Sequence, residues 1–337
     1  MIKVLKPGLL TSIQDLGRYG YQKYGVIASG VMDPFSHRVA NLLVGNDENC
    51  PTMEISLLGP VIEFQQDAII SICGGNLTPT IDYKPIYMWR TIFVKKGSEL
   101  RFGPAETGCR AYLAVAGGFD IPIIMDSYST YLRGEIGGYH GRALQAGDEV
   151  AFGDSSERAN RIMDKLVKAN RDSSQSFMDA NWSVATEMLP ELTGRSAVRV
   201  TKGRQYELFS EESQKQFQAE SFRVSTQSDR MGYRLEGPAL HLKEPEELIS
   251  EAVSFGSVQV PSDGNPIVLL ADRQTTGGYP KIAQVATVDL PCMAQLKPGE
   301  AVRFEFINHS EAQRLYLARE QYMRSLKNGI LLKIGRN

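Results

Sequence analysis

The sequence has 337 residues, of which 42% are hydrophobic and 23% are charged, and its formal net charge is −2. This length predicts two domains, and the composition is ordinary for a globular protein. The charge balance, without a long Lys/Arg block, argues against nucleic acid as a partner, and no apolar run reaches the roughly 18 residues of a membrane-spanning helix. The first residues also lack a signal-peptide pattern, so we expect a cytoplasmic protein that does not bind membranes.

The first clear element is a helix that follows short strands broken by glycine. Asp33 can cap it, Pro34 suits its first position and Gly45 can end it. The apolar stripe of this helix predicts that it packs on a β scaffold. Its other face, which carries His37 and Arg38, is predicted to be solvated.

Most of the remaining pattern predicts short β-strands. Runs of three to six residues, rich in β-branched or aromatic side chains, are bounded by Gly, Pro, Asn or Asp. Such strands with frequent turns are typical of antiparallel barrels or sandwiches. Helices are expected near 154–172, 211–218 and 311–326, the first of them followed by a polar linker. We therefore predict an N-terminal β domain (1–153), a helix and linker (154–192), a C-terminal β domain (193–309), and a C-terminal helix and tail (310–337).

Two pairs of segments repeat in the same order in both halves. The segment 12–21 and the segment 225–233 both run Ser-x-Gln, then Asp, then Gly-Tyr, and 54–61 aligns with 251–258 from glutamate to valine. Small slips in spacing are tolerated in turns but not inside strands, so the first pair predicts turns. The shared order favours two related β domains.

The densest group of chemically useful side chains is Ser228–Arg234. In one interpretation Asp229 caps an Asx turn and the arginines form surface ion pairs. In the other, Asp229 transfers or orients a proton, Arg230 and Arg234 hold a carboxylate or phosphate, and Tyr233 donates to a developing oxyanion. The sequence alone does not decide between them.

A second candidate group follows in the same half. This group is a glycine turn whose backbone amides could line an anion site, and it consists of Gly277, Gly278, Tyr279 and Lys281. A simple tight turn explains the same residues. Glu251 is a further candidate carboxylate, ranked below Asp229. Its counterpart Glu54 is expected to be a solvated carboxylate.

The N-terminal echo offers Asp15 and Arg18 as candidate substrate- or phosphate-binding residues, although a structural turn is the favoured interpretation of both. We expect this copy to support the site or contact a partner. The four cysteines and four histidines are scattered, so no metal site is predicted and the cysteines are expected to be small buried residues. The common phosphate-loop, nucleophile-elbow, zinc-protease and dinucleotide signatures are absent. No Met-Lys-Met is present, so biotin is not expected on this chain.

The ordered motifs together resemble one family. The sequence is similar to the biotin-dependent carboxyltransferase domain family, which includes KipA, the second subunit of allophanate hydrolase, and the C subunit of ATP-dependent 5-oxoprolinase. Where the family usually has Gly-Ala-Met-Asp, this sequence has valine at the second position, Val31. The motifs that carry the resemblance are Gln14–Arg18, Gly30–Asp33, Ala40–Asn46, Gly137–Arg142, Ser228–Leu235, Gln259–Gly264 and Gly277–Ala283.

The resemblance implies a mainly β protein of two cyclophilin-like antiparallel β-barrel domains with a few short helices. It implies, for a stand-alone chain, ATP-coupled opening of 5-oxoproline to glutamate together with two partners, a KipI-like B subunit, and a LamB/YcsF-like A subunit. ATP would bind here or on a partner. Alternatives are carboxyl transfer from biotin on another chain to urea or a similar amide, and regulation by binding a KipI-like kinase inhibitor.

Overall fold

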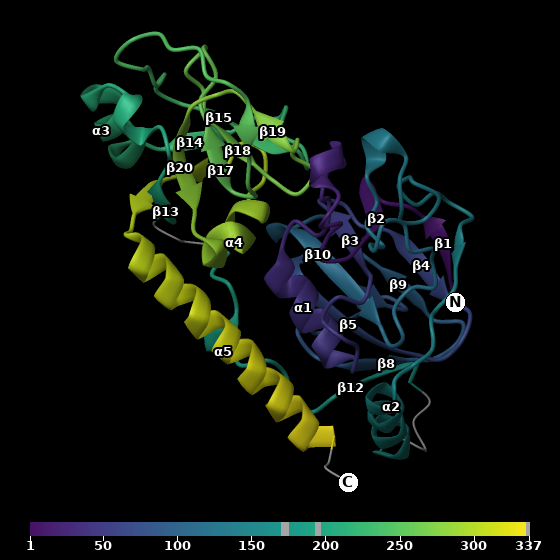
Figure 1. Cartoon of the computed structure of the whole chain (residues 1–337). Coiled ribbons are helices and arrows are strands. Elements are labelled where there is room, and N and C mark those ends of the chain that lie inside the picture. Colours follow the sequence, from purple (N-terminus) through teal and green to yellow (C-terminus); the bar gives the residue numbers. More distant parts are fainter. Residues whose placement is uncertain (170–174, 193–196, 335–337) are drawn as a thin grey trace. The chain divides into compact units, whose positions relative to one another are not determined.

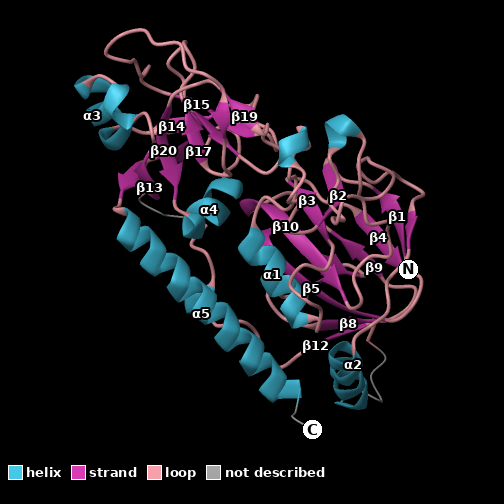
Figure 2. Cartoon of the chain, viewed as in Figure 1, coloured by secondary structure: helices cyan, strands magenta, loops and turns pink. Residues whose placement is uncertain are grey.

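The chain divides into two compact units that are discontinuous in sequence. The computed structural model describes residues 1–169, 175–192 and 197–334 (Figure 1). Unit 1 comprises 1–18, 33–190 and 321–337, and unit 2 comprises 19–32 and 191–320. Strands dominate both units (Figure 2), which confirms the mainly β prediction.

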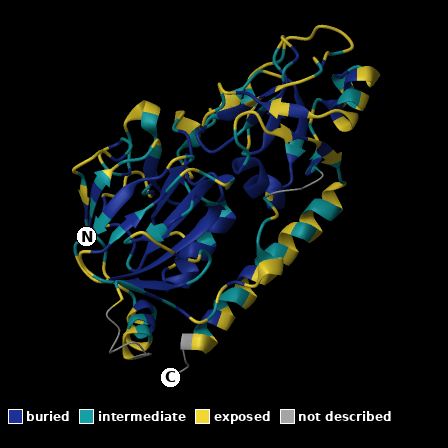
Figure 3. Cartoon of the chain, turned by 180° about the vertical axis from the view of Figure 1, so that it is seen from behind, coloured by how far each residue is buried: buried dark blue, intermediate teal, exposed yellow. Residues whose placement is uncertain are grey.

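Unit 1 is built from two six-stranded antiparallel sheets. Their inward-facing Ile, Val, Leu and Phe side chains form one hydrophobic core, and Figure 3 shows these strands as largely buried. The first sheet has the order β11 (Glu149–Val150), β1 (Ile2–Lys6), β4 (Val61–Phe64), β9 (Glu99–Arg101), β6 (Thr80–Ile81), β7 (Lys84–Pro85). The second has the order β12 (Phe177–Asp179), β8 (Ile92–Val94), β5 (Ala68–Asn76), β10 (Thr107–Val115), β3 (Thr52–Ser56), β2 (Leu10–Gln14).

Helix α1 (Pro34–Leu43) packs on β5 and β10. The side chain of Asp33 accepts from the Ser36 amide at 3.0 Å, which confirms the predicted cap. The predicted solvation of His37 is wrong, because its side chain is fully buried and its Nδ1 lies 2.8 Å from Thr52 Oγ1. The face of the helix that carries His37 is therefore covered and not solvated.

A row of polar side chains crosses that sheet beneath α1. The strand register aligns Ser12, Glu54, Tyr112 and Cys73, and all four are buried. The Tyr112 hydroxyl donates to Glu54 at 2.9 Å and accepts from the Asp33 amide at 2.8 Å. Glu54 is therefore not the solvated carboxylate that was predicted, since a hydrogen-bond partner allows its burial.

Unit 2 contains one eight-stranded sheet and a two-stranded ladder. All pairs in the large sheet are antiparallel except β13 with β22, and its core includes Phe217 stacked on Phe304 at 4.6 Å. The sheet has the order β21 (Ala301–Val302), β14 (Phe222–Val224), β15 (Gly232–Glu236), β18 (Ile267–Leu269), β17 (Ser257–Gln259), β20 (Lys281–Val285), β13 (Val198–Lys202), β22 (Phe304–Phe306), and the ladder pairs β16 (Glu251–Ala252) with β19 (Thr276–Gly277).

The other helices are α2 (Glu157–Ala169), α3 (Glu211–Ala219), α4 (Leu290–Ala294) and α5 (His309–Ile334). Short 3-10 turns span Gln22–Tyr24, Leu132–Gly134, Thr186–Met188, Tyr206–Leu208 and Thr287–Asp289. The prediction of only short helices is wrong for α5, which has 26 residues and many exposed side chains (Figure 3). The predicted helix 154–172 begins later than expected, and its last residues and the tail 335–337 lie outside the described residues.

The unit boundaries also differ from the predicted continuous domains. Segment 19–32 belongs with the C-terminal unit: Met32 packs in its core, and the Gly30 carbonyl accepts from Arg230 at 2.5 Å. A boundary formed by such long-range contacts leaves no mark in local composition. In the part of the chain that is described, no helix combines the length and apolar character needed to cross a membrane.

Candidate functional site

The predicted residues of unit 2 fall at the two ends of β18. Arg234 pairs with Ile267, which also pairs with Gln259, and Gln259 pairs in turn with Lys281. At the opposite end, β15 starts just after Arg230 and β18 ends just before Asp272. The structure therefore separates the group around Lys281 from the group around Arg230.

An ion-paired cluster forms where β16, β19 and β20 meet. Glu251 accepts hydrogen bonds from the Lys281 ammonium, from Arg204 at 2.6 Å and from Gln205 at 2.9 Å. Lys281 is buried, with 8% of its surface exposed, whereas the Arg204 side chain is largely exposed. Pairing of Glu251 with Gly277 in the small ladder holds the carboxylate at this position.

The hydrogen bonds from Lys281 and then Gln205 lower the pKa of Glu251. The carboxylate therefore stays ionised near neutral pH, which makes it a poor general acid. It can instead keep the Lys281 ammonium charged and fixed in direction. The cluster thus supplies a positioned positive charge more readily than a proton.

A hollow of about 690 Å³ adjoins the glycine turn, and none of the four side chains of this cluster lines it. It is partly apolar and has the size of a small-ligand site. Gly278 and Tyr279 contribute to its wall, and Gly277 packs against the buried Gln259. Its lining residues are Phe209, Leu240, His241, Leu242, Pro245, Glu246, Glu247, Leu248, Val260, Pro261, Ser262, Gly278, Tyr279 and Pro280.

The turn before β15 has the geometry of an Asx turn. The exposed Asp229 carboxylate accepts from the amides of Met231 at 2.8 Å and Gly232 at 3.3 Å. Arg234 is exposed on the strand that follows. The Tyr233 side chain lies in the core, where its hydroxyl donates to the Leu296 carbonyl at 3.2 Å, so Tyr233 does not reach the hollow.

Arg230 is held inside the unit. Its Nε lies 2.9 Å and its Nη2 3.1 Å from the two carboxylate oxygens of Asp272, and both side chains are about 95% buried. The same Nη2 donates to the Gly30 carbonyl. A guanidinium with these partners fixes the segment 19–32, and the predicted role as an anion clamp would require it to leave Asp272.

Asp15 and Arg18 lie in unit 1 and are fully buried there. Asp15 accepts from the Ser127 hydroxyl at 2.7 Å and the Tyr128 amide at 2.8 Å, as well as from the Ser129 hydroxyl. Arg18 donates to the carbonyls of Ile124 at 3.0 Å and Ser129 at 2.9 Å. Within unit 1 these side chains organise the loop 124–129.

The four cysteines are all free thiols, as expected for small core residues. Cys73, Cys109 and Cys292 are buried, whereas Cys50 is only partly buried, so the prediction of burial is wrong for that one residue. Among the described residues, no three His, Cys, Asp or Glu side chains are grouped so that they could hold a metal ion.

Sequence reasoning missed two residues near the predicted ones, namely Arg204 and Gln205. Arg204 lies 47 positions before Glu251, so no local motif joins them. Only the tertiary contacts distinguish these side chains.

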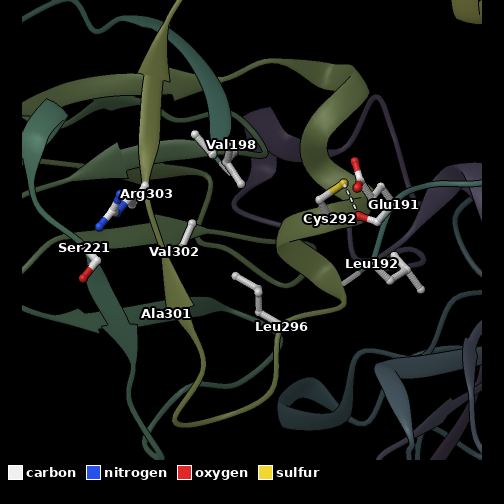
Figure 4. Close-up of a pocket in the computed structure, with 10 residues that line it drawn as sticks. Glu191, Leu192, Val198, Ser221, Cys292, Leu296, Ala301, Val302 and Arg303 are labelled. Atoms are coloured by element: carbon white, nitrogen blue, oxygen red, sulfur yellow. Dashed lines mark hydrogen bonds between the residues drawn. The ribbon is translucent and has the colours of Figure 1, made fainter. Parts of the chain in front are cut away.

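A second, smaller hollow of about 350 Å³ occurs elsewhere in unit 2 (Figure 4). Its wall is mixed in polarity and includes Val198, Leu296 and Val302, with Arg303 and Ser221 toward one end. Cys292 Sγ lies 3.8 Å from the Glu191 carbonyl oxygen. None of the predicted site residues lines this hollow.

The fold and site define a mainly β protein of two units, with a positively charged, ion-paired cluster next to a ligand-sized hollow. The family model described as "Carboxyltransferase domain, subdomain A and B" matches residues 24–306. The chain belongs to this carboxyltransferase domain family, which confirms the resemblance.

Similar proteins include the C subunit of 5-oxoprolinase from Haemophilus influenzae, 37% identical over 97% of this chain and 98% of that protein. The Escherichia coli protein of the same name is 35% identical over 97% of each. Among solved structures, the Kluyveromyces lactis urea amidolyase superposes with a TM-score of 0.85 at 32% identity. This match covers 96% of the present chain but only 20% of that much longer one.

Proposed function

We propose that the chain is the C subunit of a cytoplasmic, ATP-dependent 5-oxoprolinase. The observation that supports this most directly is the extent of the similarity: two bacterial proteins named as the C subunit of 5-oxoprolinase match over nearly their whole length. The yeast urea amidolyase corresponds to the chain over only 18% of its length. The proposed partners are a KipI-like B subunit, and a LamB/YcsF-like A subunit.

The chemistry follows from the stability of the lactam. In the proposed reaction the lactam oxygen attacks the γ-phosphorus of ATP, and the bond to the β–γ bridging oxygen breaks to release ADP. Water then adds to the activated ring carbon, and the C–N bond breaks with a proton going to nitrogen, which leaves the γ-carboxyl as an acyl phosphate. A second water hydrolyses this acyl phosphate and releases phosphate. The products are glutamate, ADP and phosphate.

We assign the ion-paired cluster a stabilising role in this sequence. Negative charge develops on oxygen during both steps, and a fixed ammonium in a partly dry site stabilises such charge more than it would in water. Lys281 is the proposed stabilising cation, with Glu251 holding it and the Gly277–Gly278 turn shaping the wall. Asp229 is retained as a proposed acid/base or orienting residue, although the exposed turn that carries it lies at the opposite end of β18 from Lys281.

ATP is proposed to bind mainly on one of the partner chains. Phosphates favour the N-terminus of a helix because its amides and dipole are positive. In the described part of the chain, the four helices longer than eight residues each carry a carboxylate at the N-cap or in the first turn, namely Asp33, Glu157, Glu211 and Glu311. These ends are unsuited to a triphosphate.

The test is to purify the chain together with the two proposed partners and to measure glutamate release with and without ATP. We expect release only when all three chains and ATP are present. A Glu251→Gln variant, which keeps shape but removes the charge that fixes Lys281, is expected to lower turnover roughly 10- to 100-fold. ATP-independent release, or none from a stable complex, would contradict the proposal. Full activity of Asp229→Asn would remove Asp229 from the mechanism.

Carboxyl transfer to urea or a similar amide is the second candidate function. It is favoured by the family itself and by the TM-score of 0.85 to urea amidolyase. This function requires biotin on another chain, bicarbonate and a biotin carboxylase. Turnover that avidin abolishes would support it, whereas avidin-insensitive glutamate release supports the lactam reaction.

A further inference from the structure

Two of the family motifs, at 14–18 and 137–142, contact the same loop of unit 1, the segment 120–129. From the first motif, Arg18 donates to the carbonyls of Ile124 and Ser129. From the second, a Cβ at Gly137 would overlap the Ser129 carbonyl and lie only 2.6 Å from Arg18 Nη2. Only glycine permits this close approach. The two motifs therefore share a structural task, which is to hold the loop.

The contacts that hold this loop are buried. Asp15 and Arg18 are fully enclosed, and Asp15 binds the loop through the Ser127 hydroxyl, the Tyr128 amide and the Ser129 hydroxyl. Hydrogen bonds shielded from water in this way resist local opening. The loop is thus fixed on a rigid base, although most loops on protein surfaces are mobile.

The loop turns sharply between Ile124 and Ser127. The Ile124 amide donates to the Ser127 carbonyl at 3.0 Å, and the Ser127 amide donates to the Ile124 carbonyl at 3.3 Å. Between them Met125 and Asp126 have φ angles of 52° and 57°. Type I′ turns require positive φ at both central positions, which usually selects Asn or Gly. Other residues persist there where the surrounding contacts over-determine the backbone, so the turn is kept in one shape.

The tip of the loop presents three consecutive apolar side chains to solvent. Ile123, Ile124 and Met125 expose 58%, 37% and 38% of their surfaces, and Pro122 before them is also exposed. Surface apolar residues scattered singly are ordinary, whereas contiguous ones mark interaction sites. Because the backbone beneath them is already ordered, binding through these side chains has a small entropic cost.

The charge around the tip distinguishes between possible occupants. Asp120 and Asp126 are exposed on either side of the apolar residues, and the segment 119–130 contains no Lys, Arg or His. An anionic bilayer surface would repel such a tip. The larger hollow on a second copy of the chain is also unsuitable, because Glu246 and Glu247 line it. A different protein, with an apolar groove and Lys or Arg at its rim, has the complementary chemistry.

We propose that the segment 122–126, here called the apolar turn, docks into an apolar groove of a partner protein whose rim carries Lys or Arg. Ile123, Ile124 and Met125 enter the groove, and the two aspartates face its cations. Identifying this protein as one of the two proposed partner chains rests on the proposed function. Asp15 and Arg18 are then positioning residues of an interface.

The test is titration calorimetry of the full chain with the purified KipI-like chain and with the purified LamB/YcsF-like chain. Ile123→Glu places a carboxylate in the apolar groove and is expected to weaken binding roughly 10- to 100-fold. Leu9→Glu, at an aliphatic residue of unit 1 that is 65% exposed, is the matched control and should bind as wild type does. Thermal melts establish that both variants are folded.

The charge of the rim is tested by Asp120→Lys. Charges at the edge of an interface act mainly on the association rate and on its salt dependence. The variant should therefore associate more slowly than wild type at low salt, and the difference should shrink at high salt. Faster association of Asp120→Lys would overturn the basic rim and with it the stated chemistry of the partner.

A further variant separates the rigidity of the turn from its contact surface. The Ser127 hydroxyl donates to Asp15 at 2.7 Å and accepts from the Ser129 amide at 3.0 Å, so Ser127→Ala loosens the loop and leaves its exposed side chains unchanged. We expect faster hydrogen exchange in 124–129 and binding that is about 3- to 10-fold weaker, because the loop must then be ordered on association. Unchanged affinity would overturn the positioning role.

The outcomes separate this interface from the reaction. A three-chain complex that releases glutamate and assembles equally well with Ile123→Glu overturns the interface and leaves the proposed function standing. Assembly that is lost in Ile123→Glu and kept in Leu9→Glu supports the interface, and a wild-type complex that then releases no glutamate contradicts the function alone. Three results would overturn the stated partner: wild type that binds neither chain, dimerisation that Ile123→Glu abolishes, and binding to phosphatidylserine-containing vesicles that Ile123→Glu abolishes.

Discussion

At the scale of single residues, burial decides what each charged group can do. His37 shows this most clearly, because its imidazole is completely enclosed between α1 and the sheet of unit 1. Desolvation lowers its pKa to about 4, from an ordinary value of 6.5. The ring is therefore neutral in the folded protein over the whole physiological range.

This burial predicts a pH-dependent stability. Because the folded-state pKa is below the unfolded one, the unfolded chain takes up a proton first, and stability falls as pH decreases from about 6.5 to about 4. The loss from this group alone should approach about 3 kcal/mol. Urea unfolding at several pH values should show a shallower dependence for His37→Gln than for wild type. The exposed His140→Gln should keep the wild-type slope, and equal slopes for all three would contradict the assignment.

The buried ion pair between Arg230 and Asp272 leads to a second prediction. Asp272→Asn leaves the guanidinium enclosed without its counter-ion, which should cost about 3–5 kcal/mol of unfolding free energy. Glu207→Gln, in the exposed pair with Lys202, should change it little. Chemical denaturation measures both. If Asp272→Asn lowers the unfolding free energy as little as Glu207→Gln does, Arg230 must be paired with another anion or with water in that variant.

At the scale of elements, strand register places the candidate residues. Antiparallel pairing of β18 with β15 and β17 sends Arg230 and Asp272 to one end and Gln259 and Lys281 to the other. Residues near each other in sequence, such as Arg230 and Arg234, are thereby separated. Distant residues such as Arg204 and Glu251 are joined.

Two glycines are expected to respond in opposite ways to substitution by alanine. They are Gly329 in α5 and Gly203, which follows β13 and lies against β20. A Cβ at Gly329, inside α5, would meet no atom within 4 Å, so Gly329→Ala should stabilise the protein by about 0.5–1 kcal/mol. A Cβ at Gly203 would lie 2.2 Å from the Lys281 carbonyl oxygen, so Gly203→Ala should destabilise it by about 1–3 kcal/mol. Thermal melts test the pair. A stable Gly203→Ala protein would show that β20 can move, together with Lys281.

At the scale of the whole molecule, each unit has its own hydrophobic core. Units with separate cores are expected to unfold as separate cooperative transitions. Trp89 and Trp182 both belong to unit 1, so tryptophan fluorescence follows that unit, while circular dichroism follows both. Phe217→Ala should remove about 3–5 kcal/mol from unit 2 alone. We expect a lower circular-dichroism transition with an unchanged fluorescence transition, and a joint shift would show that the units unfold together.

The sequence by itself determined the local elements and the family. Alternating β-branched residues, the Asp33–Pro34 start and the glycine turns are local signals, because strand and helix periodicity act over a few residues. They predicted the mainly β class and helix α1, which begins at Pro34 as expected. The ordered motifs identified the family because they extend over most of the chain.

Only the tertiary structure decided which charges are partnered. Local patterns cannot say that Asp272 occupies Arg230, that Lys281 and Arg204 meet at Glu251, or that segment 19–32 belongs to unit 2. The physical reason is that burial and ion pairing depend on contacts between residues tens to hundreds of positions apart, and the function of a charged side chain follows from those contacts.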